Sequence, residues 1–244
     1  MTNFVLVHGA WHGSWCWSRV RRLLTASGHE VFTPTLTGLG ERSHLLSRAV
    51  GLDTHVDDIA SLLTWEDLHD VVLVGHSYGG IVVRHIADRM AERIRALVYL
   101  DAFVPDDGKS LIDYVPDAQR DAFREQAQRH GDGWKVPPIP AAAFGVNAAD
   151  AERVDRKCTM HPLACFEAPT QIGSPHHRVT NIGYISATGF DGPFEQFAEM
   201  AVRRGWWHEP LACGHDVMLD MPNELCTILL QRTSSALAAA DQEV

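Results

Sequence analysis

The amino-acid sequence predicts an α/β fold with a mostly parallel sheet of about six strands. Short apolar runs alternate with stretches of helical periodicity, and strands that are joined by helices pair in parallel through right-handed crossovers. The run at 71–74 is wholly apolar, which is typical of a strand that is covered on both faces. The predicted strands are residues 4–7, 30–33, 71–74, 96–100, 182–187 and 206–209, and the predicted helices that flank them are residues 15–26, 54–63, 81–93, 193–204 and 223–239.

Glycine, proline and capping residues support several of these boundaries. Gly28 follows the first predicted helix at the position of a C-terminal cap. Pro34 ends the second strand, because proline cannot donate a hydrogen bond to a sheet. Asp53 is suited to cap the N-terminus of the second helix. The alternation of strands and helices then continues as far as Asp101, where it breaks.

The segment 104–180 interrupts this pattern and is predicted to be an inserted cap. It contains eight prolines, with short helical stretches at 117–129 and 148–156 between them. It also holds several large aromatic residues, which favour a packed unit over a solvated linker. We therefore expect a core formed by residues 1–103 and 181–244, with a helical cap at 104–180.

Length and composition limit the possible partners. The 244 residues suffice for one domain with a sizeable core, and 45% of them are hydrophobic. Lys and Arg number 21 and Asp and Glu number 31, so the formal net charge is −10, which argues against nucleic acid as a partner. We also expect no membrane span and no signal peptide, and hence a cytoplasmic protein. The five cysteines show no CxxC spacing, which favours free thiols over a metal site.

The segment Gly75-His76-Ser77-Tyr78-Gly79 matches the G-x-S-x-G pattern of a nucleophile elbow. It directly follows a predicted buried strand and directly precedes a predicted helix, which is the context that such an elbow requires. Glycines beside the serine leave room for a tight turn, and the helix N-terminus stabilises developing negative charge. Ser77 is therefore predicted to be a catalytic nucleophile.

A serine nucleophile needs a general base, and position selects one of the fourteen histidines. In proteins with this elbow the base follows the last strand. His215 lies between the last predicted strand and the last helix, whereas His208 falls inside the strand pattern. His176 and His177 fall in the predicted cap, where we expect solvated side chains. His215 is the predicted base.

Two aspartates could orient this base. Asp191 follows the strand 182–187, which is the commonest location of the acid, but its glycine-rich surroundings also fit an exposed turn. Asp101 ends the strand 96–100, one strand nearer to the nucleophile. A carboxylate in so apolar a segment is costly to bury unless it is hydrogen-bonded. We favour Asp101 and keep Asp191 as the alternative.

The loop after the first strand is expected to complete the site. Backbone N–H groups of Ala10, in this loop, and of Tyr78, after the nucleophile, are the candidate donors of an oxyanion hole. Large side chains from the same loop and from the cap could line a substrate pocket. The candidates are Trp11, Trp134, Phe144, Met160 and Phe166.

Six stretches of the chain resemble one branch of the α/β-hydrolase family, which holds plant methyl esterases, hydroxynitrile lyases and related bacterial esterases. They are VLVHGAWHGSWCW at 5–17, TLTGLGER at 35–42, VVLVGHSYGG at 71–80, LVYLDAFVP at 97–105, HPLACFEAP at 161–169 and GHDVMLDMP at 214–222. The resemblance spans nearly the whole chain. It implies an α/β-hydrolase fold with Ser77 as nucleophile, His215 as base, and Ala10 and Tyr78 as oxyanion donors.

The departures from this branch are informative. The plant esterases carry their acid at the position of Phe190 and lack an aspartate at position 101, whereas haloalkane dehalogenases place their acid after the equivalent strand. Hydroxynitrile lyases add a lysine after the catalytic histidine and a threonine in the oxyanion loop. This chain has Asp216 and Gly9 at those positions, and a carboxylate beside departing cyanide would repel it.

The sequence thus predicts a serine hydrolase that cleaves a small carboxylic ester without a metal or other cofactor. Alternatives on the same scaffold are a lyase of the hydroxynitrile type and a hydrolase of lactones, thioesters or amides. A non-catalytic ligand receptor is a further alternative, which the intact Ser77 and His215 disfavour. The expected partner is a small-molecule ester, and the protein could form a homodimer.

Overall fold

The computed structural model of the chain describes residues 1–173 and 178–234. Six strands form one sheet in the order β2-β1-β3-β4-β7-β8, and every neighbouring pair is parallel. This confirms the predicted fold class. The strands are β1 (Asn3–Val7), β2 (Glu30–Phe32), β3 (Val71–His76), β4 (Ile94–Leu100), β7 (Asn181–Ala187) and β8 (Trp207–Leu211).

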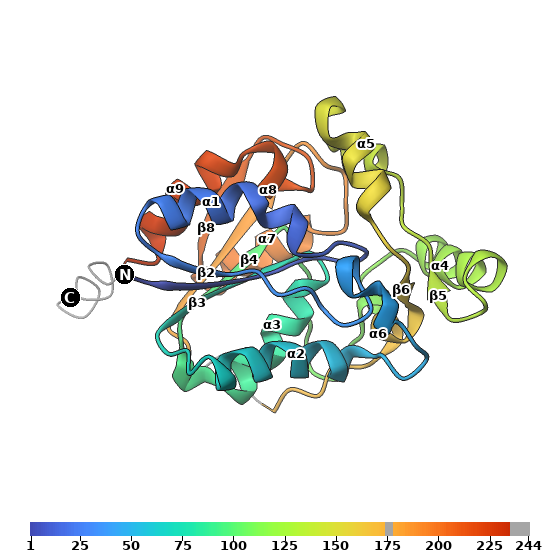
Figure 1. Cartoon of the computed structure of the whole chain (residues 1–244), viewed down its shortest axis with the longest axis horizontal. Coiled ribbons are helices and arrows are strands. Elements are labelled where there is room, and N and C mark those ends of the chain that lie inside the picture. Colours follow the sequence, from blue (N-terminus) through green and yellow to red (C-terminus); the bar gives the residue numbers. More distant parts are fainter. Residues whose placement is uncertain (174–177, 235–244) are drawn as a thin grey trace.

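Helices cover both faces of the sheet (Figure 1). Figure 1 shows α1, α8 and α9 on one side of the sheet and α2 and α3 on the other, which explains why the central strands β3 and β4 are buried along almost their whole length. The bounds are α1 (Ser18–Ala26), α2 (Leu52–Trp65), α3 (Gly79–Arg89), α7 (Glu195–Arg203), α8 (Val217–Asp220) and α9 (Pro222–Arg232).

The segment between β4 and β7 lies beside the carboxyl ends of the strands, at the right of Figure 1. Its β5 and β6 form a two-stranded antiparallel ladder, which the sequence pattern did not predict because each strand has only two residues. Its elements are α4 (Asp117–His130), β5 (Lys135–Val136), α5 (Ala148–Lys157), β6 (His161–Pro162) and α6 (Leu163–Glu167).

The predicted element boundaries differ from the structure mainly at helix ends. The first predicted helix starts as a short 3-10 helix, Ser14–Trp17, before α1. The final predicted helix corresponds to α9, which ends at Arg232, and residues 235–239 of that prediction lie outside the described residues. His176 and His177 also lie outside them.

All five cysteines are free thiols, as predicted. Within residues 1–173 and 178–234, no helix has both the length and the apolar character of a membrane span.

Candidate active site

Ser77 occupies the sharp turn between β3 and α3. Its φ of 53° lies in the left-handed region, which is unfavourable for a residue with a side chain and typical of this elbow. The turn also packs closely on the loop after β1, since a Cβ atom on Gly79 would come within 2.7 Å of the His8 carbonyl oxygen. The backbone N–H of Ser77 donates to the Leu100 carbonyl, which ties the turn to the end of β4.

The two expected oxyanion donors lie on either side of Ser77. Ala10 belongs to the loop after β1, Tyr78 starts the turn into α3, and both line the same cavity as Ser77. Over the described part of the chain, neither backbone N–H donates a hydrogen bond to another group. The phenol of Tyr78 is fully buried and hydrogen-bonds His55 Nδ1 at 2.8 Å, so this side chain holds the turn from below.

His215 lies between β8 and α8, where the sequence places it, and its ring lines the cavity that contains Ser77. Aromatic rings surround the imidazole: Phe194 stacks on it at 4.8 Å between ring centroids and Phe190 lies at 4.9 Å. The backbone of His215 is also fixed, because its N–H donates to the Phe144 carbonyl and its C=O accepts from His76 Nε2 at 3.0 Å.

Asp101 contacts the base directly. Its Oδ2 lies 2.6 Å from His215 Nδ1, and its Oδ1 accepts from the backbone N–H of Ala187 at 3.1 Å. The side chain is about 98% buried, so both carboxylate oxygens have partners where water cannot supply them. The backbone of Asp101 has a φ of 41°, a second unfavourable conformation beside the elbow.

Asp191, the alternative acid, lies in the loop between β7 and α7. It is exposed, and no hydrogen bond joins it to His215 among the described residues. The side chains that face His215 from this loop are Phe190 and Phe194. The structure therefore brings Asp101, and not Asp191, to the Nδ1 side of the imidazole.

A buried ion pair beside the base was not predicted. His12 Nδ1 lies 2.8 Å from the Ala10 carbonyl and its Nε2 lies 3.0 Å from Asp216 Oδ2. Both ring nitrogens face acceptors, so the imidazole carries both protons. Burial lowers the pKa of His12, but Asp216 and Cys158 outweigh it and raise that pKa well above the ordinary value.

This pair corrects one part of the sequence interpretation. Asp216 is fully buried, is neutralised by His12, and does not line the cavity with Ser77, so it would not repel a leaving anion as expected. It links the oxyanion loop to the base loop instead. Nothing in the spacing of residues 12 and 216 could have indicated the pair, because only the fold brings these loops together.

The cavity at Ser77 is narrow and almost wholly apolar. Of the five predicted pocket residues, Trp11, Phe144 and Phe166 line it. Among the described residues, the polar side chains in its wall are those of Ser77, Tyr78 and His215, Gln119 of α4, and the indole of Trp11. Lining residues that the sequence analysis did not single out are Phe103, Leu111, Val115, Phe123, Ile139, Phe190, Pro193 and Phe194.

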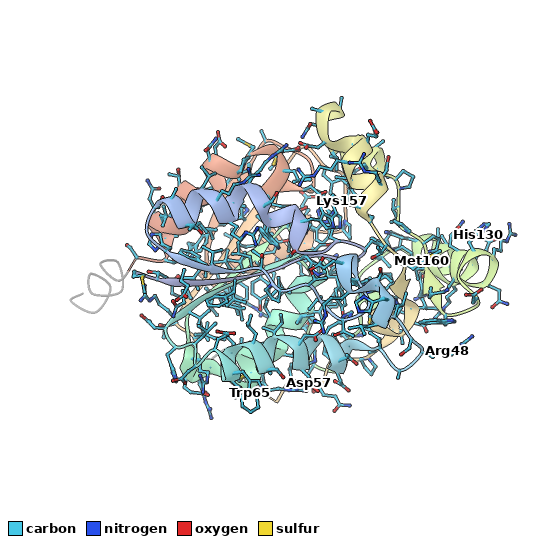
Figure 2. All side chains as sticks on the ribbon, in the orientation of Figure 1. Arg48, Asp57, Trp65, His130, Lys157 and Met160 are labelled. Carbon is cyan, nitrogen blue, oxygen red and sulfur yellow. The ribbon has the colours of Figure 1, made fainter. Side chains whose placement is uncertain are left out.

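Trp134 and Met160 are the two pocket candidates that the structure places elsewhere. The Trp134 ring is half-buried and contacts two cations, Arg48 at 5.4 Å and Lys135 at 5.2 Å from its centroid. Figure 2 shows Arg48 at the periphery of the molecule, and Met160 in the segment that follows α5. Neither candidate lines the cavity with Ser77. Aromatic side chains of the inserted segment can pack against cations near the surface as well as line a pocket.

Beside the loop after β1 lies a buried polar cluster of His55, His161 and Cys165, in which one ring nitrogen of each histidine and the Cys165 Sγ lie within 4.8 Å of one another. Their positions in the sequence did not suggest this proximity. Hydrogen bonds already engage them: His55 Nε2 donates to the Thr37 carbonyl, and His161 Nδ1 accepts from the Trp11 N–H. Burial lowers the pKa of His55 to about 4 and raises that of Cys165 to about 12, so the cluster is uncharged at neutral pH.

Known proteins resemble this chain in sequence and in fold. Residues 4–227 match the Alpha/beta hydrolase family. The chain belongs to this family. A carbendazim hydrolyzing esterase of Nocardioides sp. (strain SG-4G) is 45% identical over 234 residues, which is 92% of this chain and 97% of the relative. Methylesterase 1 of Arabidopsis thaliana is 38% identical over 106 residues, 43% of this chain and 40% of the relative.

Solved α/β hydrolases share the same architecture. An extracellular α/β-hydrolase from a Paenibacillus species, described as a structural and functional homologue of tobacco salicylic acid binding protein 2, superposes with a TM-score of 0.84. The match covers 96% of this chain and 100% of that one at 21% identity, so it shows a shared fold. In this chain, Ser77 and Asp101 directly follow β3 and β4, and His215 lies in the loop after β8.

Proposed function

We propose that this α/β hydrolase is an esterase that cleaves a small apolar carboxylic ester by acyl transfer through Ser77. The observation that carries the proposal is the buried 2.6 Å contact between His215 and Asp101, with His215 and Ser77 in the wall of one cavity. A base, an acid that orients it and a serine in an elbow are the three parts of a catalytic triad.

In the proposed reaction, Ser77 Oγ attacks the ester carbonyl while His215 accepts its proton. Asp101 holds Nδ1 and stabilises the imidazolium that forms. Negative charge develops on the carbonyl oxygen, where the N–H groups of Ala10 and Tyr78 would receive it. His215 then protonates the departing alcohol, and a water activated by the same histidine releases the acid and frees Ser77. This route requires no metal or organic cofactor.

The substrate we propose is small, flat and uncharged. The cavity wall is largely aromatic, and among the described residues Gln119 contributes an amide to it. We assign residues 104–180 as the cap, because this segment supplies Phe144, Phe166 and Gln119 to the wall. The 45% identical relative is named for carbendazim hydrolysis, so carbendazim is the first compound to try. Cytoplasmic location and a homodimer stay predictions from the sequence.

Lyase chemistry of the hydroxynitrile type is not supported. A threonine cannot replace Gly9 without rearrangement, since a Cβ atom there would lie 2.8 Å from the Ser77 Cβ and 2.9 Å from His76 Nδ1. The position after the base holds Asp216, which is paired with His12 instead of facing the cavity. The parts that the lyases add to the esterase machinery are therefore both missing.

Hydrolysis of p-nitrophenyl acetate by the wild-type protein and by Ser77→Ala tests the proposal. We expect turnover to fall by about 10⁶-fold, which is typical for loss of a triad nucleophile. The folded state should persist, because the change removes one hydroxyl from a turn that is held by backbone hydrogen bonds. A variant that retains activity within about tenfold of wild type would contradict the assignment of Ser77.

A further inference from the structure

Trp11, which directly follows Ala10, has an unfavourable backbone conformation. Its φ is 64°, in the left-handed region that bulky residues avoid. It directly follows Ala10, so the conformation of Trp11 determines the course of the loop that presents the Ala10 N–H. Such a conformation persists only where surrounding contacts impose it.

Those contacts come from the segment between β4 and β7. The Trp11 N–H donates to His161 Nδ1 at 3.3 Å, the Trp11 carbonyl accepts from the Thr159 N–H at 2.9 Å, and the indole N–H donates to the Val136 carbonyl at 3.0 Å. All three partners belong to or adjoin the β5–β6 ladder, in which Val136 is paired with His161. The inserted segment therefore satisfies the polar groups of Trp11.

His161 is itself rigidly placed. Its side chain is fully buried, it stacks on Phe166 at 4.7 Å between centroids, and it meets Tyr78 edge to face at 4.8 Å. Burial, together with the nearby His55 and His8, lowers the pKa of His161 well below its ordinary value. The ring thus stays neutral, and Nδ1 remains available as an acceptor. One side chain contacts Trp11, next to the first oxyanion donor, and Tyr78, which carries the second.

We infer that His161 is a positioning residue through which the docked cap assembles the oxyanion hole. Its acceptor nitrogen holds Trp11 in the left-handed conformation, and its ring supports the side chain of Tyr78. The cap is then a part of the catalytic machinery and not only a cover over the pocket. This inference rests on the proposed ester hydrolysis for its kinetic consequence, but its structural part is independent of that function.

Two variants with side chains of similar size, His161→Asn and His161→Leu, separate the loss of the hydrogen bond from the loss of ring packing. In His161→Asn, the Oδ1 atom stands where Nδ1 stands in histidine and can accept from the Trp11 N–H. In His161→Leu, a branched side chain close in size to that of asparagine has no acceptor. Because loss of an oxyanion donor costs about 10²–10³-fold in turnover, we expect His161→Leu to lower kcat for p-nitrophenyl acetate by at least about 30-fold with little change in KM. His161→Asn should stay within about fivefold of wild type.

Hydrogen exchange at the Trp11 amide gives a readout that does not depend on activity. It should become at least about tenfold faster in His161→Leu than in His161→Asn, since exchange reports local opening. His85→Leu is the control for general destabilisation: His85 is a buried histidine within α3 that bonds the Ile81 carbonyl and does not line the cavity. It should leave kcat and Trp11 exchange unchanged.

The outcomes distinguish the two proposals. Equal exchange at Trp11 in the leucine and asparagine variants would overturn the positioning role, and so would equal kcat values in an active enzyme. Inactive wild-type protein would contradict the proposed function alone, and faster exchange in His161→Leu would then still support the role of His161 in holding the loop.

Discussion

The ends of β4 and β7 each offer an aspartate to the base, and the two are placed very differently. Asp101 is buried, and its carboxylate bonds His215 and the Ala187 N–H. Asp191 is exposed in the loop after β7, and Phe190 occupies the place next to the imidazole. This difference indicates that burial and hydrogen bonding decide which aspartate reaches His215. The strand after which the acid commonly occurs matters less.

The largest effect on this comparison should come from Asp101→Asn. The amide keeps the size of the side chain but cannot stabilise the imidazolium, and it favours the wrong tautomer of His215. By analogy with serine proteases, kcat for a p-nitrophenyl ester should fall by about 10⁴-fold. Steady-state kinetics at several pH values would measure this loss.

Asp191→Asn is the matched control. An exposed carboxylate that water can solvate is not needed to orient the base, so kcat should change by less than about tenfold. The opposite ranking of the two variants would move the role of acid to Asp191.

A second variant tests whether the acid can be moved between the two strands. The plant esterases that this chain resembles carry their acid at the position of Phe190, whose ring lies 4.9 Å from that of His215. Adding Phe190→Asp to Asp101→Asn should raise kcat at least about tenfold above that of Asp101→Asn alone, because a carboxylate near the imidazole stabilises its protonated form. Phe190→Leu in the same background should restore nothing. Equal rates in the two double variants would show that position 190 cannot reach the base.

A smaller effect on turnover, but a clear one on stability, is expected from Asp216→Asn. Burial raises the pKa of Asp216, but the charge and hydrogen bond of His12 outweigh it and hold that pKa well below the ordinary value. The variant leaves His12 buried without its counter-charge, so the free energy of unfolding should fall by about 3 kcal/mol. Urea unfolding of both proteins at several pH values would measure the difference.

The pH dependence of that difference follows from the two pKa shifts. The pKa of His12 is raised on folding, so its contribution is complete below the unfolded value of about 6.5 and is lost as pH rises through the folded value. The lowered pKa of Asp216 makes its contribution complete above about pH 3.9 and lost as pH falls through the folded value. The difference in free energy of unfolding between wild type and Asp216→Asn should therefore be largest between about pH 4 and 6.5 and shrink in alkali. A difference that grows with rising pH would contradict the ion pair.

The fold and the positions of Ser77 and His215 within it could be predicted because their signals are local. The apolar run of β3, the glycines around Ser77 and the place of His215 after the last strand each reflect a backbone requirement within a few residues. The choice of Asp101 over Asp191 came from the cost of burying an unpaired carboxylate, and the structure places Asp101 against the base.

What sequence alone could not provide are contacts between distant segments. The His12–Asp216 pair joins loops that lie 204 residues apart, and His161 meets Trp11 across 150 residues. Trp134 was expected in the pocket because aromatic residues favour apolar walls, yet its ring lies against Arg48 and Lys135. An aromatic side chain satisfies either environment, and only the packing of the insertion decides between them.

The most direct test of the central claim is a crystal structure of the protein after inactivation by a phosphonate ester, which mimics the tetrahedral intermediate. The account predicts a phosphorus–oxygen bond to Ser77 Oγ and a phosphonyl oxygen within about 2.7–3.1 Å of the Ala10 and Tyr78 nitrogens. His215 should still bond Asp101 through Nδ1. An adduct on another residue, an oxygen turned away from both amides, or His215 turned toward Asp191 would contradict it.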